Sequence, residues 1–508
     1  MATFLRNFNC FAPCNEVSVK ILVDEVRNKV LFVQAGKDFV DVLLSFLTLP
    51  LGTIARLVSQ ESNMENVCVG SLSLLYQSVA NLDKDNFRSA FEKELLVRPI
   101  NSMEEYCKYL KLNIDDTEKL RFFNCSSNQK CINVPKKRNC HCCEKKRTNL
   151  CAVKKPAKNG FVPVTATFLI SDDLNVKPDN SQISRNSVSL LKYLGCENMD
   201  SIKIVTVDVT RKEILDLVKC SLLSATPLTD VFLSKKLFLE KPRPVNVLDL
   251  DFGSMGAHLV KGTIEVKAMV RKSNKKILYA LGEEDFADLL LNFLTFPLGG
   301  VENMLNGNSG LDNIDNLFKS MVDLDPERYF RSKSDLLSKQ VKSNFDGKQI
   351  IKSPSTYMVT DDLVITPGSS TDAISFLTKM RIPLSDLQER MISIGNKEAH
   401  SLLKASLISS SALTNGLDYE FRIFIVKDFA LITGLFAFLQ SYIVVLLCFE
   451  ASHIRITLHF IFSRPLVSLL SSIIYAETSE IEMVPSFSQT CGSLIFCVKS
   501  VEDGWTHK

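Results

Sequence analysis

One long segment occurs twice in this chain. The stretch NKVLFVQAGKDFVDVLLSFLTLPLG, from Asn28 to Gly52, recurs without a gap as KKILYALGEEDFADLLLNFLTFPLG, from Lys275 to Gly299. Two shorter stretches repeat in the same order, FLISDDLNVKP as YMVTDDLVITP and KCSLLSATPLT as KASLISSSALT. Because self-similarity along a chain marks repeated structural units, we expect a tandem duplication in which both copies bury the same apolar faces.

The opening of each copy predicts a β-hairpin followed by a helix. Apolar residues alternate from Val17 to Val23, and a second short strand is expected over Val30 to Val33. From Asp38 to Leu47 the apolar residues follow the spacing of one helix face, and Pro50 ends the helix. The second copy predicts the same elements over residues 264–270, 277–280 and 285–294. A hairpin followed by a helix is similar to the opening of a β-grasp fold.

The later part of each copy predicts a strand, a helix, a strand and a helix. In the first copy these are residues 167–170, 188–194, 202–209 and 213–223. The fold class is therefore α+β. The prolines in the stretch 240–249 favour an extended linker. We expect a first repeat over 1–240, a second over 241–417, and an atypical hydrophobic, helical tail over 418–508.

Length and composition indicate an intracellular chain with several domains. The chain has 508 residues, 46% hydrophobic and 23% charged, and a formal net charge of +3. This is the composition of folded domains, and the near balance of charge argues against steering of the whole chain onto nucleic acid or anionic lipid. The first residues lack the apolar core of a secretory signal, so the cytosol or nucleus is expected.

A cysteine-rich insert of the first repeat, residues 123–158, is a candidate zinc site. Thiolates bind Zn²⁺ tetrahedrally, and Cys140 and Cys143 have the two-residue separation that suits one ion. Cys125 and Cys131 form the candidate second pair, with His141 or Cys142 as substitutes. An unmetallated loop is the alternative. The second repeat has no cysteine in the corresponding segment, so any zinc would be structural bracing and not part of the shared fold.

The same insert is strongly basic, which raises the possibility of nucleic-acid binding. Its lysines and arginines surround a single carboxylate, Glu144. A nucleic-acid surface usually adds aromatic side chains for stacking, and none lies between Phe123 and Phe161. A solvated basic loop is therefore favoured, and nucleic acid is not the expected partner.

Two aspartate pairs recur, and they are the candidates for acid–base or metal chemistry. Asp172 and Asp173 correspond to Asp361 and Asp362. Each pair follows an apolar strand, where carboxylates commonly occupy a turn, so a structural role is favoured. The sequence contains no phosphate-binding loop, nucleophile elbow, zinc-protease helix or dinucleotide fingerprint, and therefore no catalytic residue is assigned.

The tail contains one apolar stretch long enough to cross a bilayer. Residues 429–449, FALITGLFAFLQSYIVVLLCF, carry no charge. A single membrane anchor, a helix buried against the rest of the chain, and sequence foreign to the preceding repeats are three alternatives.

Long motifs of the first repeat carry a resemblance to a known family. VSVKILVDEVRNKVLFVQAGKDFVDVLLSFLTLPLGTI, YCKYLKLNIDDT, FLISDDLNVKP and SLLSATPLTDVFL together are similar to a plant family known as domain of unknown function 674. The resemblance extends from Val17 to about Leu417 and stops where the tail begins. It implies kinship and assigns no catalytic residue, substrate or partner.

These features favour a non-enzymatic protein-interaction or scaffold protein that binds other proteins. An enzyme or ligand-binding protein with a site between the two repeats is the first alternative, and the paired aspartates would serve it. Nucleic-acid binding through the basic insert is the second.

Overall fold

The computed structural model describes most of the two repeats and isolated parts of the insert. The described residues are 16–60, 68–116, 121–124, 130–133, 149–150, 160–162, 166–179, 201–234, 258–329, 349–352 and 355–417. All of them belong to one compact unit, Met1–Ile425. The expected helix over 188–194, the linker over 240–249 and the apolar stretch over 429–449 lie outside the described residues.

The first repeat forms a five-stranded antiparallel sheet with the strand order β7-β6-β2-β1-β8. The hairpin comprises β1 (Val17–Asp24) and β2 (Lys29–Gly36), as predicted. The other strands are β6 (Thr167–Ser171), β7 (Val176–Pro178) and β8 (Ile202–Val209). Burial alternates from Val17 to Ile21, which is why the apolar positions there are spaced by two, and the remaining residues of β1 are all buried.

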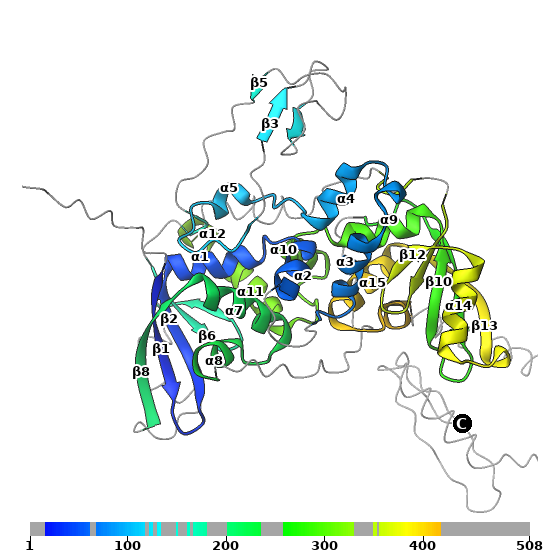
Figure 1. The fold of residues 1–508 in the computed structure, drawn as a ribbon. Coiled ribbons are helices and arrows are strands. Elements are labelled where there is room, and N and C mark those ends of the chain that lie inside the picture. Colours follow the sequence, from blue (N-terminus) through cyan, green and yellow to red (C-terminus); the bar gives the residue numbers. More distant parts are fainter. Residues whose placement is uncertain are drawn as a thin grey trace, which may run out of the picture. The chain divides into compact units, whose positions relative to one another are not determined.

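Helices of the first repeat cover one face of this sheet (Figure 1). The helix α1 (Lys37–Phe46) contacts β1, β2 and β6, and nearly all of its residues are buried. The helix α7 (Arg211–Leu223) begins at Thr210, which forms a capping box with Glu213. The short helix α8 (Pro227–Thr229) follows α7 and contacts β2.

The second repeat forms a second five-stranded antiparallel sheet, with the order β12-β11-β10-β9-β13. Its strands are β9 (Ile264–Arg271), β10 (Ile277–Gly282), β11 (Tyr357–Thr360), β12 (Ile365–Pro367) and β13 (Leu387–Ile394). The helices α9 (Glu284–Phe293) and α15 (Asn396–Ile408) contact it and correspond in sequence to α1 and α7. The mixed helix and sheet content confirms the α+β prediction.

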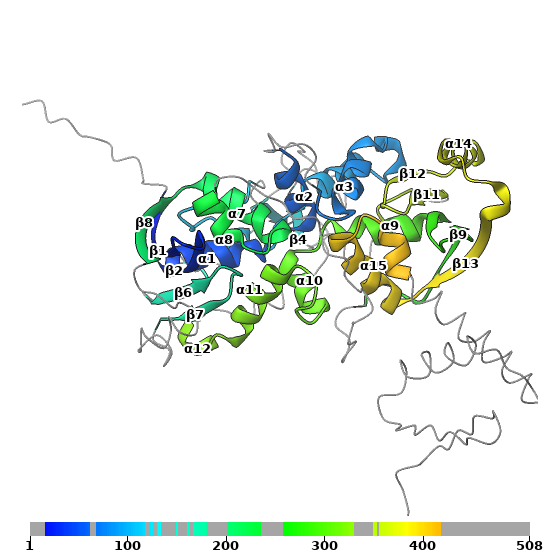
Figure 2. The ribbon, with the colours of Figure 1, turned by 90° about the horizontal axis from the view of Figure 1, so that it is seen from below.

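The helix α14 (Ser370–Met380) belongs to a second, smaller apolar cluster of the second sheet. Its Ala373 and Phe376 belong to the same cluster as Leu278 and Met358, whereas the strand neighbours Ile277, Tyr357 and Val359 belong to the main core. Figure 2 shows α14 on the side of β11 and β12 away from α15. This sheet is therefore covered on both faces, since the side chains of a strand alternate between its faces.

Between the sheets lie helices for which the sequence offered no assignment. The first repeat contributes α2 (Leu51–Gln60), α3 (Leu72–Asn81), α4 (Ala90–Val97) and α5 (Glu104–Cys107). The second contributes α10 (Leu298–Met304), α11 (Asp312–Asp323) and α12 (Pro326–Tyr329). We call α2 with α3 the first arm, and α10 with α11 the second arm.

Each arm packs on the sheet of the other repeat (Figures 1 and 2). The first arm's α3 contacts β12 and α9 of the second repeat, and the second arm's α11 contacts β7, α1 and α7 of the first. A serine hydroxyl of each arm also accepts a backbone N–H from the edge strand of the other repeat. The N–H of Val176 on β7 donates to Ser320 Oγ of α11 over 2.9 Å, and the N–H of Ile365 on β12 donates to Ser78 Oγ of α3 over 3.0 Å.

The arms cross at a reciprocal backbone junction. Pro50 and Pro297, which correspond in sequence, form a β-bridge. Gly52 N–H donates to the carbonyl of Leu294 over 2.8 Å, and the corresponding Gly299 N–H donates to that of Leu47 over 2.7 Å. Leu51 and Leu298 make the matching pair of bonds, each over 2.9 Å. These four bonds relate the two repeats by a local two-fold symmetry.

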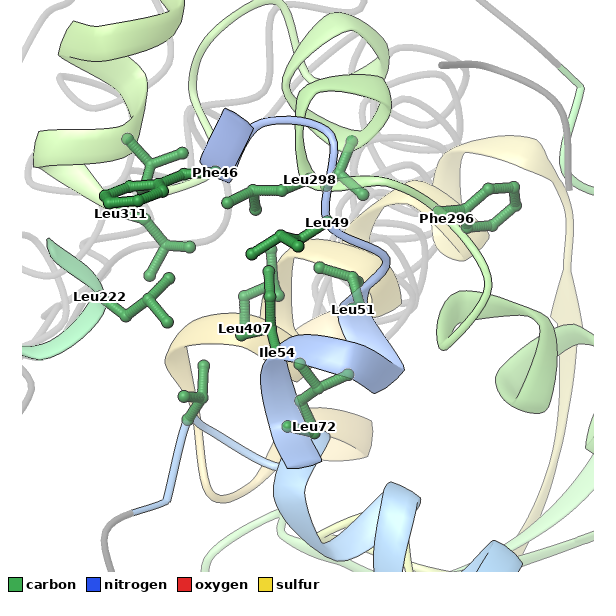
Figure 3. Packing of buried hydrophobic residues seen from close by; sticks show 14 of the residues in the cluster. Phe46, Leu49, Leu51, Ile54, Leu72, Leu222, Phe296, Leu298, Leu311 and Leu407 are labelled. Atoms are coloured by element: carbon green, nitrogen blue, oxygen red, sulfur yellow. The ribbon is translucent and has the colours of Figure 1, made fainter. Parts of the chain in front are cut away.

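The side chains around this junction come from both repeats and form one continuous core. Figure 3 shows Phe46, Leu49, Leu51, Ile54, Leu72 and Leu222 of the first repeat beside Phe296, Leu298, Leu311 and Leu407 of the second. All ten are buried. Burial of apolar area is the main stabilising term in folding, so the arms bind the two repeats into one hydrophobic unit.

A three-stranded sheet, β4-β3-β5, lies in the cysteine-rich insert and includes two residues before it. It consists of β3 (Arg121–Asn124), β4 (Lys130–Asn133) and β5 (Asn149–Leu150). In the part of the chain that the structure describes, no helix is both long and apolar enough to cross a membrane.

Candidate functional site

The first aspartate of each recurring pair ties the end of its own repeat to the sheet. Asp172 Oδ1 accepts the N–H of Thr229 over 2.9 Å, and its Oδ2 accepts the hydroxyl of Thr229 over 2.7 Å. The Thr229 hydroxyl in turn accepts the N–H of Val30 over 2.9 Å. Asp172 is buried, and this burial raises its pKa, an effect that the bonds from Thr229 oppose. Its two oxygens therefore hold α8 against β2.

The second repeat builds the same tie from the corresponding residues. Asp361 Oδ1 accepts the N–H of Thr414 over 2.8 Å, and the Thr414 hydroxyl accepts the N–H of Ile277 over 2.9 Å. Burial raises the pKa of Asp361 as well. Lys276 Nζ lies 3.4 Å from Asp361 Oδ2 and supplies a compensating charge.

The second aspartate of each pair shapes a tight turn. Asp173 accepts the hydroxyl of Ser171, and Asp362 accepts that of Thr360. The next residues, Leu174 and Leu363, have the left-handed φ values of 61° and 64°, and both side chains are fully buried. A leucine is strained in this region of backbone space, so the aspartate turn and the burial together maintain it.

The four aspartates do not converge. Asp172 and Asp173 lie beside the first sheet, and Asp361 and Asp362 beside the second. Within the described ranges, no hydrogen bond or ion pair joins one pair to the other. This geometry favours the interpretation, made from the sequence, that these aspartates have a structural role at turns.

Another pair of corresponding carboxylates, Asp41 on α1 and Asp288 on α9, was not singled out from the sequence. Asp41 Oδ1 accepts the N–H groups of Phe161 and Val162 over 3.0 and 2.8 Å. Asp288 accepts those of Ile350 and Ile351, the latter over 2.9 Å. Burial raises the pKa of Asp41, and it raises that of Asp288 to about 6. The sequence did contain a signal for this pair. A carboxylate occurs at the same position of both helices, on a face that is otherwise apolar.

The tie at Asp41 holds one end of the cysteine-rich insert. Gly160 precedes the two N–H donors and has a φ of 68°, and a Cβ atom there would lie 2.3 Å from Asp41 Oδ2. Only glycine fits this position. At the other end of the insert, Asp116 accepts two hydrogen bonds from the guanidinium of Arg56 on α2, one over 2.6 Å. The body thus holds residues on both sides of the insert, Asp116 before it and residues 160–162 after it.

The candidate zinc ligands fall almost wholly outside the described residues. Cys125, Cys140 and Cys143, with the substitutes His141 and Cys142, are not described. Cys131 lies on β4, where its backbone pairs with Phe123. Among the described residues, no group of three or more histidine, cysteine, aspartate or glutamate side chains could hold a metal ion.

The described cysteines and histidines show no catalytic arrangement. Burial raises the pKa of the Cys107 thiol to about 12 and also raises that of Cys220, so both thiols are protonated and poor nucleophiles at neutral pH. His400 Nδ1 lies 2.6 Å from the carbonyl oxygen of Asn396, and burial lowers its pKa. His258 Nδ1 lies 2.6 Å from the amide of Asn396. Both rings therefore have structural partners.

The second arm contains a buried carboxyl group that the first arm lacks. Glu302 on α10 is 0% exposed, and neither of its oxygens has a hydrogen-bond partner among the described residues. Burial raises its pKa well above the usual value, and the negative charge of Asp315 on α11 acts in the same direction. The corresponding residue of the first repeat is Ala55. Burial and the neighbouring charge therefore favour the protonated form of Glu302.

The comparisons with known proteins rest on one family. A model of a protein family of unknown function, DUF674, matches residues 14–351 and again residues 338–397. No curated protein and no solved structure matched the chain. The matched residues include both hairpins, both arms and both aspartate pairs. Since they span far more than half of the sequence, the chain belongs to the DUF674 family of proteins of unknown function.

Proposed function

We propose that this chain is a non-enzymatic protein-interaction or scaffold protein, formed by tandem duplication of one α+β unit over residues 1–240 and 241–417. The observation that carries the proposal is the use of the recurring polar groups. Asp172, Asp361, Asp41 and Asp288 each accept backbone N–H groups from a distant segment. Carboxylates engaged in this way hold the fold together and are not presented to a substrate. The likeness to a β-grasp fold stays a prediction.

Exposed apolar side chains in the second repeat are the groups we assign to protein contact. Ile374, Met380, Leu384 and Met391 are 63%, 49%, 83% and 61% exposed. They occur close together in the sequence, on α14, the turn after it and β13. Exposed apolar groups that gather on a surface favour protein–protein contact.

Affinity capture with surface variants tests the scaffold proposal. The full chain carrying both Leu384→Ser and Met391→Ser is compared with the wild type and with a control carrying Val26→Ser and Ile204→Ser. The control positions are also exposed, 82% and 67%, and lie in the first repeat. We expect proteins that are lost with the first variant and retained with the control, and that co-elute with the purified wild-type chain. Identical captured sets for all three chains would refute the assignment.

The alternative of an enzyme or ligand-binding protein makes a different prediction for the aspartates. If Asp172 and Asp361 served a ligand, Asp→Asn changes would weaken binding and leave stability unchanged. On the structural assignment each change lowers the melting temperature. Asp172→Asn weakens the two hydrogen bonds that Thr229 donates, and Asp361→Asn weakens the one that the Thr414 N–H donates. A thermal unfolding scan of the two variants separates the alternatives.

We infer in addition that Cys125, Cys131, Cys140 and Cys143 bind a structural zinc ion. In support, β4 carries Cys131 and pairs with β3, and Cys125 follows the last residue of β3 in sequence. The test is the metal content of the full purified chain, with and without Cys140→Ser and Cys143→Ser. We expect about one zinc per chain in the wild type and loss of it in the variant. A wild-type chain without zinc, after purification free of chelators, would end this proposal.

A further inference from the structure

The strand β13 forms an open edge of the second sheet. Figures 1 and 2 show it at the outer end of that sheet, and its pairing with β9 is regular over all eight of its residues. On its other side, no described strand pairs with it. An edge of this kind presents backbone N–H and C=O groups to any chain that adds a strand.

The register with β9 identifies which groups lie on the open edge. The N–H of Lys272 donates to the carbonyl of Asp386 over 2.7 Å, just before β13 begins. Since bonded and non-bonded pairs alternate along an antiparallel ladder, the even-numbered residues of β13 bond to β9. The odd-numbered residues turn their N–H and C=O groups to the open edge, and none of these groups has a hydrogen-bond partner among the described residues: Leu387, Glu389, Met391 and Ser393.

The opposite edge of each sheet, by contrast, is protected. The edge strands β7 and β12 have three residues each and end in Pro178 and Pro367. Each of them also donates an N–H to a serine hydroxyl of the other repeat's arm. Short strands, prolines and covering elements prevent the addition of a further strand. β13 is long, has neither proline nor lysine, and pairs with β9 without a bulge.

The side chains of the open edge define the chemistry of a strand that fits it. Leu387 is partly buried against the smaller apolar cluster, which also contains α14, and Met391 is 61% exposed. Glu389 lies between them, and its half-exposed carboxylate is 3.1 Å from Lys267 Nζ. Because these three residues share one face of β13, an added strand suits them best with apolar, basic and apolar residues at every second position.

A second copy of the chain does not meet these requirements. Two β13 strands related by a two-fold axis cover both Leu387 and Met391 only when Glu389 or Arg390 lies at the centre of the pairing. Either arrangement places that charged residue directly opposite its own copy, which destabilises a sheet. Every other centre leaves Leu387 or Met391 facing a position beyond the end of β13. The edge therefore suits an extended segment of a different sequence.

We propose that the open edge of β13 binds an extended segment of a partner protein, which adds a sixth strand to the second sheet. In this mode of recognition, main-chain hydrogen bonds supply affinity and the alternate side chains supply specificity. The inference rests on the proposed function, because it names the kind of segment that the protein-interaction surface receives.

Peptide selection on the full chain tests the proposal. The probe is a phage-displayed library of random peptides longer than the eight residues of β13, selected on the wild type after depletion on Met391→Pro. Proline removes the N–H of position 391, and an edge strand tolerates it where that N–H faces solvent. Thr206→Pro on β8 is the matched control, because Thr206 pairs with Lys20 as Met391 pairs with the corresponding Lys267. Circular dichroism checks that both variants are folded.

We expect enriched peptides that alternate apolar and basic residues with intervening positions of any kind. They should bind Met391→Pro at least about tenfold more weakly than the wild type and bind Thr206→Pro with unchanged affinity. Met391→Ser, which keeps the N–H, should weaken binding less than Met391→Pro does. N-methylation of the peptide should abolish binding at every second residue and have little effect between, because only alternate N–H groups of an added strand face β13.

The N-methyl scan uses the wild-type chain, so it decides the question even if Met391→Pro does not fold. The absence of enriched peptides, or a scan without the period of two, would overturn strand addition. A wild-type dimer in size exclusion that Met391→Pro dissociates would also overturn it, since a second copy would then cover the edge. Proteins captured through Leu384 and Met391, together with a scan that lacks the period, would refute strand addition alone and retain the scaffold proposal.

Discussion

Replacement of Glu302 by glutamine should remove a contribution that makes the free energy of unfolding depend on pH. The corresponding position of the first repeat makes no such contribution. Glu302 is completely buried on α10, without a hydrogen-bond partner among the described residues and with Asp315 as a negative neighbour. Its pKa in the folded chain lies well above the ordinary value of 4.5. Ala55 occupies the matching place in the first arm and does not titrate.

The sign of the effect follows from proton binding. Between pH 4.5 and its folded pKa, Glu302 is protonated in the folded chain and largely ionised in the unfolded chain. The folded chain thus binds one more proton, so the free energy of unfolding falls as the pH rises. The slope approaches about 1.4 kcal/mol for each pH unit within this window. Glutamine keeps the size of the side chain and does not titrate, so Glu302→Gln abolishes this contribution.

Urea unfolding followed by far-ultraviolet circular dichroism between pH 5 and pH 7 measures the effect. The quantity of interest is the free energy of unfolding of Glu302→Gln minus that of the wild type, because the titration of all other groups cancels. We expect this difference to increase as the pH rises, by up to about 1.4 kcal/mol for each pH unit over which Glu302 stays protonated in the folded chain. Glu265→Gln is the matched control, since Glu265 is exposed on β9. A difference that stays constant with pH, as it should for the control, would refute the buried, protonated state of Glu302.

Three further changes test the ties between segments, each by urea unfolding at pH 7. Gly70→Ala should lower the free energy of unfolding by about 3 kcal/mol or more, because its Cβ meets a backbone carbonyl, whereas Gly36→Ala, with nothing within 4 Å, should be nearly neutral. Asp172→Ala should cost about 3 kcal/mol by leaving two buried donors without an acceptor, and Asp173→Ala, at a more exposed turn, less than about 1 kcal/mol. Ser320→Ala should cost about 1 to 2 kcal/mol, because the strand N–H that it accepts stays buried and unpaired. Equal losses for the two glycine changes, or for the two aspartate changes, would contradict the assigned contacts, as would a neutral Ser320→Ala.

The local elements could be predicted from the sequence because their physical cause is local. Alternation from Val17 to Val23 produced β1, and the helical spacing after Asp38 produced α1 at almost the expected bounds. The interpretation of Asp173 and Asp362 as turn residues agrees with the structure for the same reason, since a carboxylate bonds to a hydroxyl two residues before it. The partners of Asp172 and Asp361 were not predictable, because Thr229 and Thr414 lie more than fifty residues away.

By itself, the sequence predicted an α+β fold with one unit duplicated in tandem, and it indicated which face of each element is apolar. Only the tertiary structure decided that each arm crosses to the other sheet. The apolar face of α3 shows that this helix must be buried, but β7 and β12 offer similar edges and the hydrophobic effect has no direction. The choice between them depends on shape at a few places, such as the space that admits Gly70 against Ser406, which no periodicity in the sequence reveals.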